Sequence, residues 1–456
     1  KKQGLFAMAT GTGKTITALN CILEEYKLNG IYKFIVLVPT TALVEQWEKE
    51  IINNFNFQNL ISVRNKYFYE ELKYEDKNEN SCLLVTYATF KSSKFQKIFN
   101  RINHKNDFTL IADEAHNMGS TGFLKILNSL DDIKKRIGLS ATPSRYFDDV
   151  GEMEVFKFFN TKIDGEIPKF TYSFSISEAI NAKPKPFLCK YKYKIKFVEL
   201  QNDELTKYRK YTRDLLNFLD KDGRLKRSIE VESILKKRKD IIKKAKNKKS
   251  KLIEIVEEIG VEKFKYAFVY VPEGKEIDYS DDDSNWSEFS NDDFGLISDY
   301  TMEINKKFNN RIPIRHFTGK SKDRGEILNH FSRGKYSALF AMKCLDEGVD
   351  VPRTEIAIFC SSTGNPRQYI QRRGRVLRLH DDKKEALIYD MIVIPILEDL
   401  NDSEKEYKTE ANLVKGEVRR LIEFAKDSLS IDEVLLNKDL IKVYDFFKIN
   451  IDEFLK

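Results

Sequence analysis

The stretch Gly4-Leu5-Phe6-Ala7-Met8-Ala9-Thr10-Gly11-Thr12-Gly13-Lys14-Thr15 lies near the start of the 456-residue sequence and decides the fold that we expect. Its first five residues form a short apolar run typical of a buried strand, and the glycines that follow indicate a turn. After the turn, apolar residues recur at helical spacing, at Ile16, Leu19, Leu23 and Tyr26. A strand, a glycine-rich turn and a helix that opens with Lys-Thr together predict a phosphate-binding loop.

Such a loop binds a polyphosphate because the backbone N–H groups at the helix start point toward it. Lys14 would reach the outer phosphates, and the Thr15 hydroxyl would be a ligand of Mg²⁺. The usual pattern has glycine where this sequence has Met8, but the strand–turn–helix context favours a nucleotide site over a chance glycine-lysine turn. The residues expected to bind the nucleotide are Thr10, Gly11, Thr12, Gly13, Lys14 and Thr15.

Further apolar runs follow, and each ends in a cluster of polar residues. Continuous apolar runs are typical of parallel strands that are buried on both faces, and helical patterns separate these runs. Ligand sites of open parallel sheets lie at the carboxyl edge of the strands, so the polar clusters are expected to share one edge. The runs are 33–38, 82–85, 109–112 and 137–139.

The pair Asp113-Glu114 directly follows the apolar run 109–112. A carboxylate in this place can hold Mg²⁺ through water, and its neighbour can orient or deprotonate the attacking water. We therefore expect Asp113 in the metal site and Glu114 as a catalytic residue. The alternative is a solvated acidic turn, which the nearby phosphate loop makes less favourable.

Composition sets broad limits. A chain of this length is too long for one core, so two domains with accessory pieces are expected. The net charge of +7 is compatible with nucleic-acid binding without requiring it. The five cysteines contain no C-x-x-C pair, which favours a reducing, cytoplasmic compartment over a disulfide framework or a zinc site. The apolar stretch 386–397 is too short to span a membrane.

In the middle of the sequence, the alternation of apolar runs and helical patterns changes. The predicted organisation is a first lobe over 1–175, a second lobe over 176–400 and a helical C-terminal tail over 401–456. Within the second lobe, 204–259 reads as lysine-rich helices, and 276–293 reads as an acidic, exposed loop. The lysine-rich helices are interpreted as solvated faces over a packed apolar side, with a phosphate-contacting arm as the alternative.

A second set of charged residues lies near residue 370. Asn365 and Pro366 are a natural N-cap and first helical residue, so a helix is expected to begin there. Gln371, Arg375 and Arg378 follow, and the two arginines share a face if this stretch is helical. Two guanidinium groups on one face suit a triphosphate, because they are bidentate donors that keep their charge.

Taken together, these residues resemble the motifs of superfamily 2 helicases and translocases, over about residues 4–395 and in the family's order. In the first lobe, Ala9–Thr15 resembles motif I, Val38–Trp47 motif Ia, Thr86–Phe90 motif Ib, Asp113–His116 motif II and Ser140–Thr142 motif III. In the second lobe, Asp346–Pro352 is similar to motif V and Gln371–Arg378 to motif VI.

The resemblance implies two RecA-like α/β lobes in tandem, with ATP and Mg²⁺ between them and nucleic acid across their faces. It further implies catalytic roles for Gln371, Arg375 and Arg378. Gly348 and Asp350 would belong to the nucleotide site, as members of motif V. By family position, the contacts to the nucleic-acid backbone would come from Thr40, Thr86 and Thr89.

The amino-acid sequences of the motifs indicate a group within the superfamily. Leu345–Pro352 and Pro366–Arg378 resemble XPB-type repair helicases and the motor subunits of restriction and phage-defence systems, which act on double-stranded DNA. The alternatives are an RNA helicase and a nucleotide-gated binding switch, and the intact Glu114 and arginines disfavour the switch. Because the sequence starts at Lys1, directly before a strand, further sequence is expected upstream. Protein partners are expected at that region or at the C-terminal tail.

Overall fold

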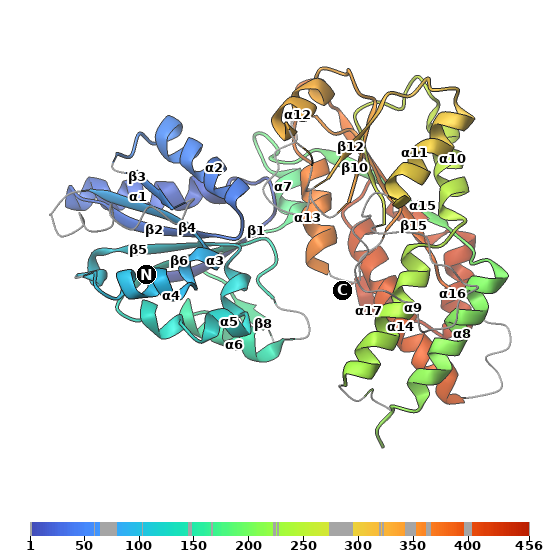
Figure 1. Cartoon of the computed structure of the whole chain (residues 1–456), viewed down its shortest axis with the longest axis horizontal. Helices are drawn as coiled ribbons and strands as arrows, with labels where there is room; N and C mark the ends of the chain where they lie inside the picture. The colour runs from blue at the N-terminus through green and yellow to red at the C-terminus, as the bar shows by residue number, and fades with distance from the viewer. Residues whose placement is uncertain are drawn as a thin grey trace. The chain divides into compact units, whose positions relative to one another are not determined.

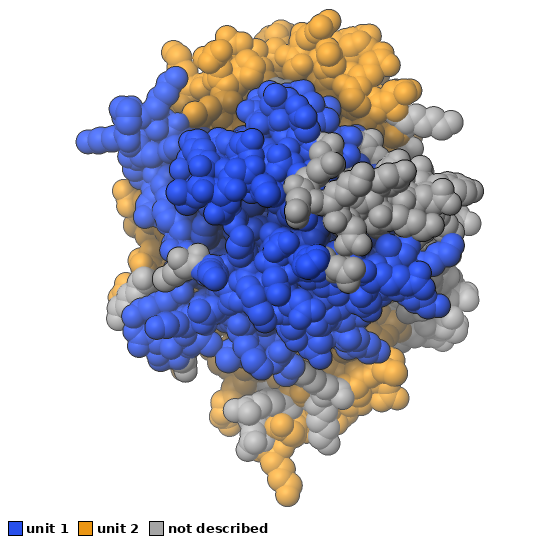
Figure 2. All heavy atoms as spheres, turned by 90° about the vertical axis from the view of Figure 1, so that its left-hand side faces the viewer, with its two compact units in different colours: residues 1–188, 346–350, 370–375 blue, residues 189–345, 351–369, 376–456 orange. Residues whose placement is uncertain are grey.

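The structure is a computed structural model that forms two compact units (Figures 1 and 2). It describes residues 2–58, 60–63, 80–102, 104–144, 148–165, 167–221, 225, 228–272, 295–318, 321, 323–342, 353–361, 366–395 and 404–455. The first unit comprises residues up to Leu188 and takes in Ile370–Arg375, and most of the remaining chain forms the second. Each unit contains a parallel sheet with packed helices, which confirms the predicted pair of α/β lobes.

The sheet of the first unit has seven parallel strands in the order β3-β4-β2-β5-β6-β1-β9. The apolar runs predicted as strands are all strands of this sheet. Strand β6 lies between β1 and β5, so the phosphate loop and the acidic pair follow strands on either side of it. The strands are β1 Gln3–Met8, β2 Lys33–Val38, β3 Leu60–Val63, β4 Ser81–Thr86, β5 Thr109–Asp113, β6 Lys135–Ser140 and β9 Tyr172–Phe174.

Both faces of this sheet are buried. Neighbouring residues of one strand enter opposite cores: Val36 packs with Trp47 of α2 on one face, and Ile35 packs with Phe95 of α4 on the other. This is why the strands read as continuous apolar runs. The helices are α1 Lys14–Asn29, α2 Thr41–Lys49, α3 Tyr87–Phe90, α4 Ser93–Phe99, α5 Thr121–Leu124, α6 Asp149–Phe158 and α7 Ile176–Asn181, and a two-stranded hairpin joins β7 Lys162–Asp164 to β8 Ile167–Lys169.

The first unit extends beyond residue 175, where the boundary was expected. Strand β9 completes the first sheet beside β1, and α7 then buries Ile176 and Ala179. The N–H of Phe187 donates to the carbonyl oxygen of Ala179 at 2.8 Å, which ties the following segment back to α7. The division between the units therefore falls after α7 rather than before it.

The second unit is built on six parallel strands in the order β10-β15-β14-β11-β13-β12. Its core lies between this sheet and helices that include α10 and α11, where Val269, Ile358 and Met391 of the sheet meet Ile255 and Tyr300. The strands are β10 Lys190–Phe197, β11 Ala267–Tyr270, β12 Ile314–Phe317, β13 Ala338–Ala341, β14 Ile356–Phe359 and β15 Glu385–Ile392.

Helices α8, α9 and α14 gather below the sheet of the second unit (Figure 1). Ile241, Leu252 and Ile255 of the lysine-rich segment are buried, as expected for packed helices beneath a charged surface. The predicted acidic loop 276–293 lies outside the described residues. The helices are α8 Asn202–Leu216, α9 Ile229–Lys243, α10 Lys248–Ile259, α11 Gly295–Lys307, α12 Arg324–Ser332, α13 Pro366–Val376, α14 Glu404–Ala425, α15 Ile431–Leu435, α16 Lys438–Phe447 and α17 Asp452–Leu455.

The C-terminal segment is helical, as predicted, and its helices belong to the second unit. Helix α14 buries Val418, Leu421 and Phe424, and α16 buries Leu440 and Val443. In the described ranges, no helix combines the length and the apolar character needed to cross a membrane.

Close packing in the first sheet makes Gly138 of β6 a sensitive position. A Cβ atom there would lie 2.5 Å from Cδ1 of Leu5 and 3.0 Å from the ring of Phe159, and both side chains are fully buried. Gly138→Ala is expected to lower the free energy of unfolding by about 1–3 kcal/mol, because the core must be overpacked. Denaturant unfolding measures this, with Gly122→Ala as control, since a Cβ at Gly122 meets its nearest atom at 3.6 Å. Equal stability of the two variants would contradict the prediction.

Candidate active site

The phosphate loop joins β1 to α1, and its two glycines adopt backbone angles that other residues avoid. Gly11 has φ +85° and Gly13 has φ +88°, both in the left-handed region. A Cβ at Gly13 would meet no atom within 4 Å, so a side chain would cause no steric clash there. Glycine is favoured because of the left-handed backbone conformation. The Thr12 hydroxyl donates to the carbonyl oxygen of Ala9 at 2.7 Å and closes the loop. Helix α1 begins at Lys14, with its first N–H groups at the loop.

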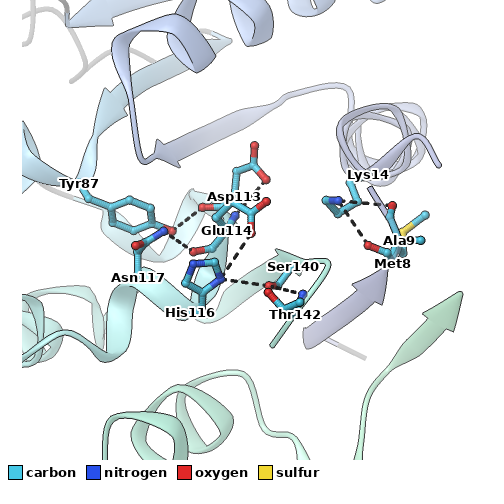
Figure 3. A network of polar contacts seen from close by, with 10 residues as sticks. All are labelled: Met8, Ala9, Lys14, Tyr87, Asp113, Glu114, His116, Asn117, Ser140 and Thr142. Carbon is cyan, nitrogen blue, oxygen red and sulfur yellow. Dashed lines mark hydrogen bonds and ion pairs between the residues drawn. The ribbon is translucent and has the colours of Figure 1, made fainter. Parts of the chain in front are cut away.

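Lys14 lies over the start of this loop. Its ammonium group donates to the carbonyl oxygens of Met8 at 3.3 Å and Ala9 at 3.5 Å (Figure 3). The charge of Lys14 also favours the ionised form of Asp113, which follows a different strand. The structure therefore brings the predicted phosphate lysine and the predicted metal carboxylate into one electrostatic site.

Asp113 is the last residue of β5 and is buried. Burial raises the pKa of its carboxyl group, while hydrogen bonds and the charge of Lys14 act in the opposite direction. Oδ2 accepts a hydrogen bond from Nε1 of Trp47 at 2.8 Å, and Oδ1 accepts one from the N–H of Glu114 at 3.0 Å. The Tyr87 hydroxyl donates to the Asp113 carbonyl oxygen at 2.8 Å, so the whole residue is held in place.

Glu114 turns away from β5 because its backbone is in the left-handed region, at φ 48°. This is uncommon for a residue other than glycine, and it separates the two neighbouring carboxylates. Oε2 of Glu114 lies 3.4 Å from Nδ1 of His116, and the same nitrogen lies 3.2 Å from the Ser140 hydroxyl (Figure 3). The Ser140 hydroxyl accepts from the Thr142 N–H at 3.1 Å. A polar chain thus connects Glu114 to the end of β6.

These residues suit the chemistry of a magnesium nucleotide. Mg²⁺ prefers hard oxygen ligands and keeps several waters, so it needs only a few protein ligands beside substrate phosphates. The carboxylate of Asp113 and the hydroxyl of Thr15 are ligands of this kind. The buried Asp113, held by a neutral indole donor, would gain a counter-charge from the ion.

Helix α13 carries the predicted second set of residues. Gln371 and Arg375 are both buried, together with Arg372 and Arg373 between them. Residues Ile370–Arg375 belong to the same compact unit as the phosphate loop. Within that unit, a Cβ at Gly374 would come 2.5 Å from the Cβ of Thr10. The backbone at Gly374 can lie this close to Thr10 because glycine has no side chain. The sequence placed these two motifs more than 350 positions apart, and the fold brings them together.

The expectation of a shared helical face for Arg375 and Arg378 is wrong. Helix α13 ends at Val376, so Arg378 follows the helix instead of continuing it. The carbonyl groups at and after the end of α13 accept hydrogen bonds from outside the helix. The ammonium group of Lys383 donates to the carbonyl oxygens of Val376 and Arg378. The N–H of Cys189 donates to the carbonyl oxygen of Leu377.

The three threonines predicted to contact nucleic acid lie at helix starts after strands of the first sheet. Thr40 caps α2 by accepting from the Leu43 N–H at 3.4 Å. Thr86 caps α3 by accepting from the N–H of Thr89 at 3.1 Å, and the two threonine hydroxyls lie 3.0 Å apart. Strands β2 and β4 pair in parallel, so both starts lie at one edge. Their contact with nucleic acid stays a prediction.

Two residues predicted for the nucleotide site cannot be placed, and three residues that hold the site were not predicted. Gly348 and Asp350 lie outside the described residues. Sequence reasoning did not assign roles to Trp47, Tyr87 and Lys383, which hold Asp113 and the end of α13. Trp47 falls in the motif Ia resemblance, and its indole N–H, a donor that needs a partner when buried, was the available signal.

Two family descriptions match parts of the chain. Residues 1–145 match the res subunit of type III restriction enzymes, and residues 289–380 match the helicase conserved C-terminal domain. The first match contains the phosphate loop and the acidic pair, and the second contains Gln371, Arg375 and Arg378.

Curated relatives share similarity over most of the chain. One is the DNA 3'-5' translocase XPB2 of Sulfurisphaera tokodaii, with 28% identity over 400 residues, 86% of this chain and 78% of the relative. Another is the putative DNA 3'-5' helicase Rad25 of Haloarcula marismortui, with 22% identity over 390 residues, 85% of this chain and 49% of the relative. The chain thus spans less than the full length of either relative.

A solved structure has a similar fold. It is described as the ATP-dependent type ISP restriction-modification enzyme LlaBIII bound to DNA, with a TM-score of 0.57 and 17% identity. The similarity covers 98% of this chain and 31% of that one. At this identity, the likeness supports the fold alone.

The first prediction from this geometry concerns Lys14 and Glu114. Lys14→Ala is expected to abolish ATP hydrolysis, because it removes the cation that binds the outer phosphates. Glu114→Gln is expected to keep ATP affinity within about threefold while lowering kcat at least about 100-fold, since only the group that activates water is changed. Nucleotide titration and steady-state hydrolysis separate the two effects. Wild-type turnover in Glu114→Gln would refute the role given to this residue.

The second prediction concerns the Trp47–Asp113 hydrogen bond. The indole N–H favours the charged carboxylate, so Trp47→Phe should raise the already raised pKa of Asp113 further. Metal binding needs the ionised form, and activity is lost as the pH falls through this pKa. The acidic limb of the kcat/KM profile should therefore move to higher pH.

Tyr87→Phe is the matched control for this pH profile. It removes a hydrogen bond to the carbonyl oxygen of Asp113 while leaving the carboxylate's own partners in place. Its acidic limb should stay where the wild-type limb lies. An equal shift in both variants would show that general loosening of the site, and not the indole donor, sets the profile.

Proposed function

We propose that this chain, which belongs to the superfamily 2 helicases and translocases, uses ATP hydrolysis to move along double-stranded DNA. The resemblance seen in the motifs is confirmed by the two family matches and by the relatives that share most of the chain. Members of this family are ATP-hydrolysing enzymes. The observation that carries the proposal is the placement of Lys14 and the pair Asp113-Glu114 at one edge of the first sheet, where the charge of Lys14 acts on Asp113.

Each residue has a role in the proposed reaction. The loop N–H groups and Lys14 would bind the phosphates, and Thr15 and Asp113 would hold Mg²⁺, which supplies positive charge for the transferred phosphate. Glu114, held apart from Asp113 and facing His116, would orient the attacking water and accept its proton.

Arg375 and Arg378 would stabilise the charge that develops on the transferred phosphate. Guanidinium groups in this role contribute about 10³–10⁵ in rate in related phosphoryl-transfer enzymes. Gln371, which lies on α13 with Arg375, would help to orient the transferred phosphate. Because such contacts strengthen in the transition state, these residues would act on kcat more than on ATP binding.

The choice of double-stranded DNA has separate support. The relative with 28% identity is described as a DNA translocase, and the N-terminal part matches a restriction-enzyme subunit. We further propose that the chain is the motor part of a restriction or phage-defence system acting in the cytoplasm. The alternative substrate is RNA, and direct comparison of the two nucleic acids decides between them.

We expect duplex DNA to stimulate the ATPase at least about fivefold more than RNA of equal length. Because the contacts would be made to phosphates, stimulation should fall steeply between about 50 and 200 mM salt. The measurement is ATP hydrolysis with titrated duplex DNA, single-stranded DNA and duplex RNA at two salt concentrations. Glu114→Gln measures any contaminating hydrolysis. Activation by RNA with no response to duplex DNA would replace this function with that of an RNA helicase.

A further inference from the structure

Helix α14 is fixed by a buried ion pair to α8 and α9, two of the helices inserted between β10 and β11 of the second sheet (the insertion helices). Glu410 is fully buried and accepts a hydrogen bond from the Tyr208 hydroxyl of α8 at 2.6 Å. It also pairs with Arg238 of α9, whose Nε donates to the Thr212 hydroxyl at 2.9 Å. Removing one member of such a pair leaves a buried charge, so this end of α14 is tied to α8 and α9.

The opposite end of α14 packs against the helix that carries the arginines. The ring of Phe424 is fully buried and lies 5.0 Å from the ring of Tyr369 in α13. It also lies 5.3 Å from the ring of Tyr193 in β10 and 6.0 Å from that of Phe359 in β14. Tyr369 belongs to the first turns of α13, which continues through Gln371 to Arg375.

Arg420 joins this end of α14 to the strand that follows α13. Its guanidinium donates to Oδ2 of Asp390 in β15 at 2.5 Å, and the same oxygen accepts from the Tyr193 hydroxyl at 2.8 Å. All three residues are buried. The guanidinium also lies 5.9 Å from the ring of Tyr369. Helix α13 is therefore held by α14 on the side of Tyr369 and by Lys383 at its end.

Between its two fixed ends, α14 contains a glycine that packing does not require. The segment from Glu410 to Phe424 spans about 20 Å as an α-helix, and Gly416 lies within it. A Cβ at Gly416 would meet no atom within 4 Å, and the residue is exposed. A side chain can therefore be introduced at Gly416 without a steric clash. Glycine in a helix interior is less favourable than alanine, because it loses more backbone freedom on folding.

We propose that α14 positions the arginine helix α13 and transmits to it the state of the insertion helices α8 and α9. The role rests on the proposed function, since it acts on the residues that would stabilise the transition state. A helix moves as a nearly rigid rod, so displacement of Glu410 with α8 and α9 displaces Phe424 and, through Tyr369, the segment that bears Arg375. Phe424, Arg420 and Glu410 are positioning residues in this scheme.

The test compares three variants of the full chain. Phe424→Leu keeps an apolar side chain but removes the ring that meets Tyr369, and Gly416→Pro interrupts the helix between its fixed ends. Both should lower the DNA-stimulated kcat about tenfold while KM for ATP stays within about threefold of wild type. Gly416→Ala is the matched control, because it changes the same exposed position without interrupting the helix, and it should keep wild-type kcat.

Amide hydrogen exchange gives a readout that does not depend on activity. In the absence of ATP and DNA, peptides that cover Pro366–Val376 should exchange faster in Phe424→Leu and Gly416→Pro than in wild type. They should be unchanged in Gly416→Ala and in Lys14→Ala, which lacks hydrolysis but keeps α14. If Gly416→Pro fails to fold, as thermal unfolding would show, Phe424→Leu alone decides.

The two proposals can fail separately. A wild-type protein that hydrolyses no ATP with any nucleic acid would overturn the proposed function, while the exchange of α13 would still test its positioning. Wild-type exchange in α13 of a folded Phe424→Leu variant would overturn the positioning role, even if the ATPase behaves as proposed. An equal rise of exchange over the whole second unit would likewise overturn it, because Phe424 would then be a general stability residue.

Discussion

The burial of both faces of a parallel sheet is the constraint on which the active site depends. In the middle of β2 and β5, successive apolar side chains enter two different cores, which disfavours polar groups there. Polar residues must therefore gather where the strands end, and in a parallel sheet these ends share one edge. Since β6 lies between β1 and β5, this edge places Ser140 between the phosphate loop and the acidic pair.

The electrostatics of that edge are arranged through donors that carry no charge. A buried carboxylate is unfavourable unless hydrogen bonds and opposite charge compensate for lost water. The Asp113 carboxylate receives one hydrogen bond from an indole and one from a backbone N–H, and the charge of Lys14 also favours its ionised form. The left-handed turn at Glu114 then directs the second carboxylate toward His116. The two acids can thus take different roles despite being neighbours in sequence.

In the second unit, the buried charges connect segments that are far apart in the chain. Arg238 of α9 pairs with Glu410 of α14, and Arg420 of α14 pairs with Asp390 of β15. Buried ion pairs add little net stability, because removing two charges from water is costly, but they tolerate few alternative arrangements. Burial of apolar side chains makes α14 part of the unit, and the two ion pairs join it to α9 and β15 at defined positions.

The sequence by itself determined strands β1, β2, β4, β5 and β6 of the first sheet, but not β3 and β9. It also indicated the glycine turn, Lys14 and the pair Asp113-Glu114, because these depend on local patterns of apolar residues and backbone conformation. Only the tertiary structure decided that Trp47 donates to Asp113, 66 positions away, and that α13 ends before Arg378. It also decided that α14 meets both the insertion and α13. The physical reason is that a side chain's partner is set by packing between distant segments, and propensity and periodicity describe only neighbours along the chain.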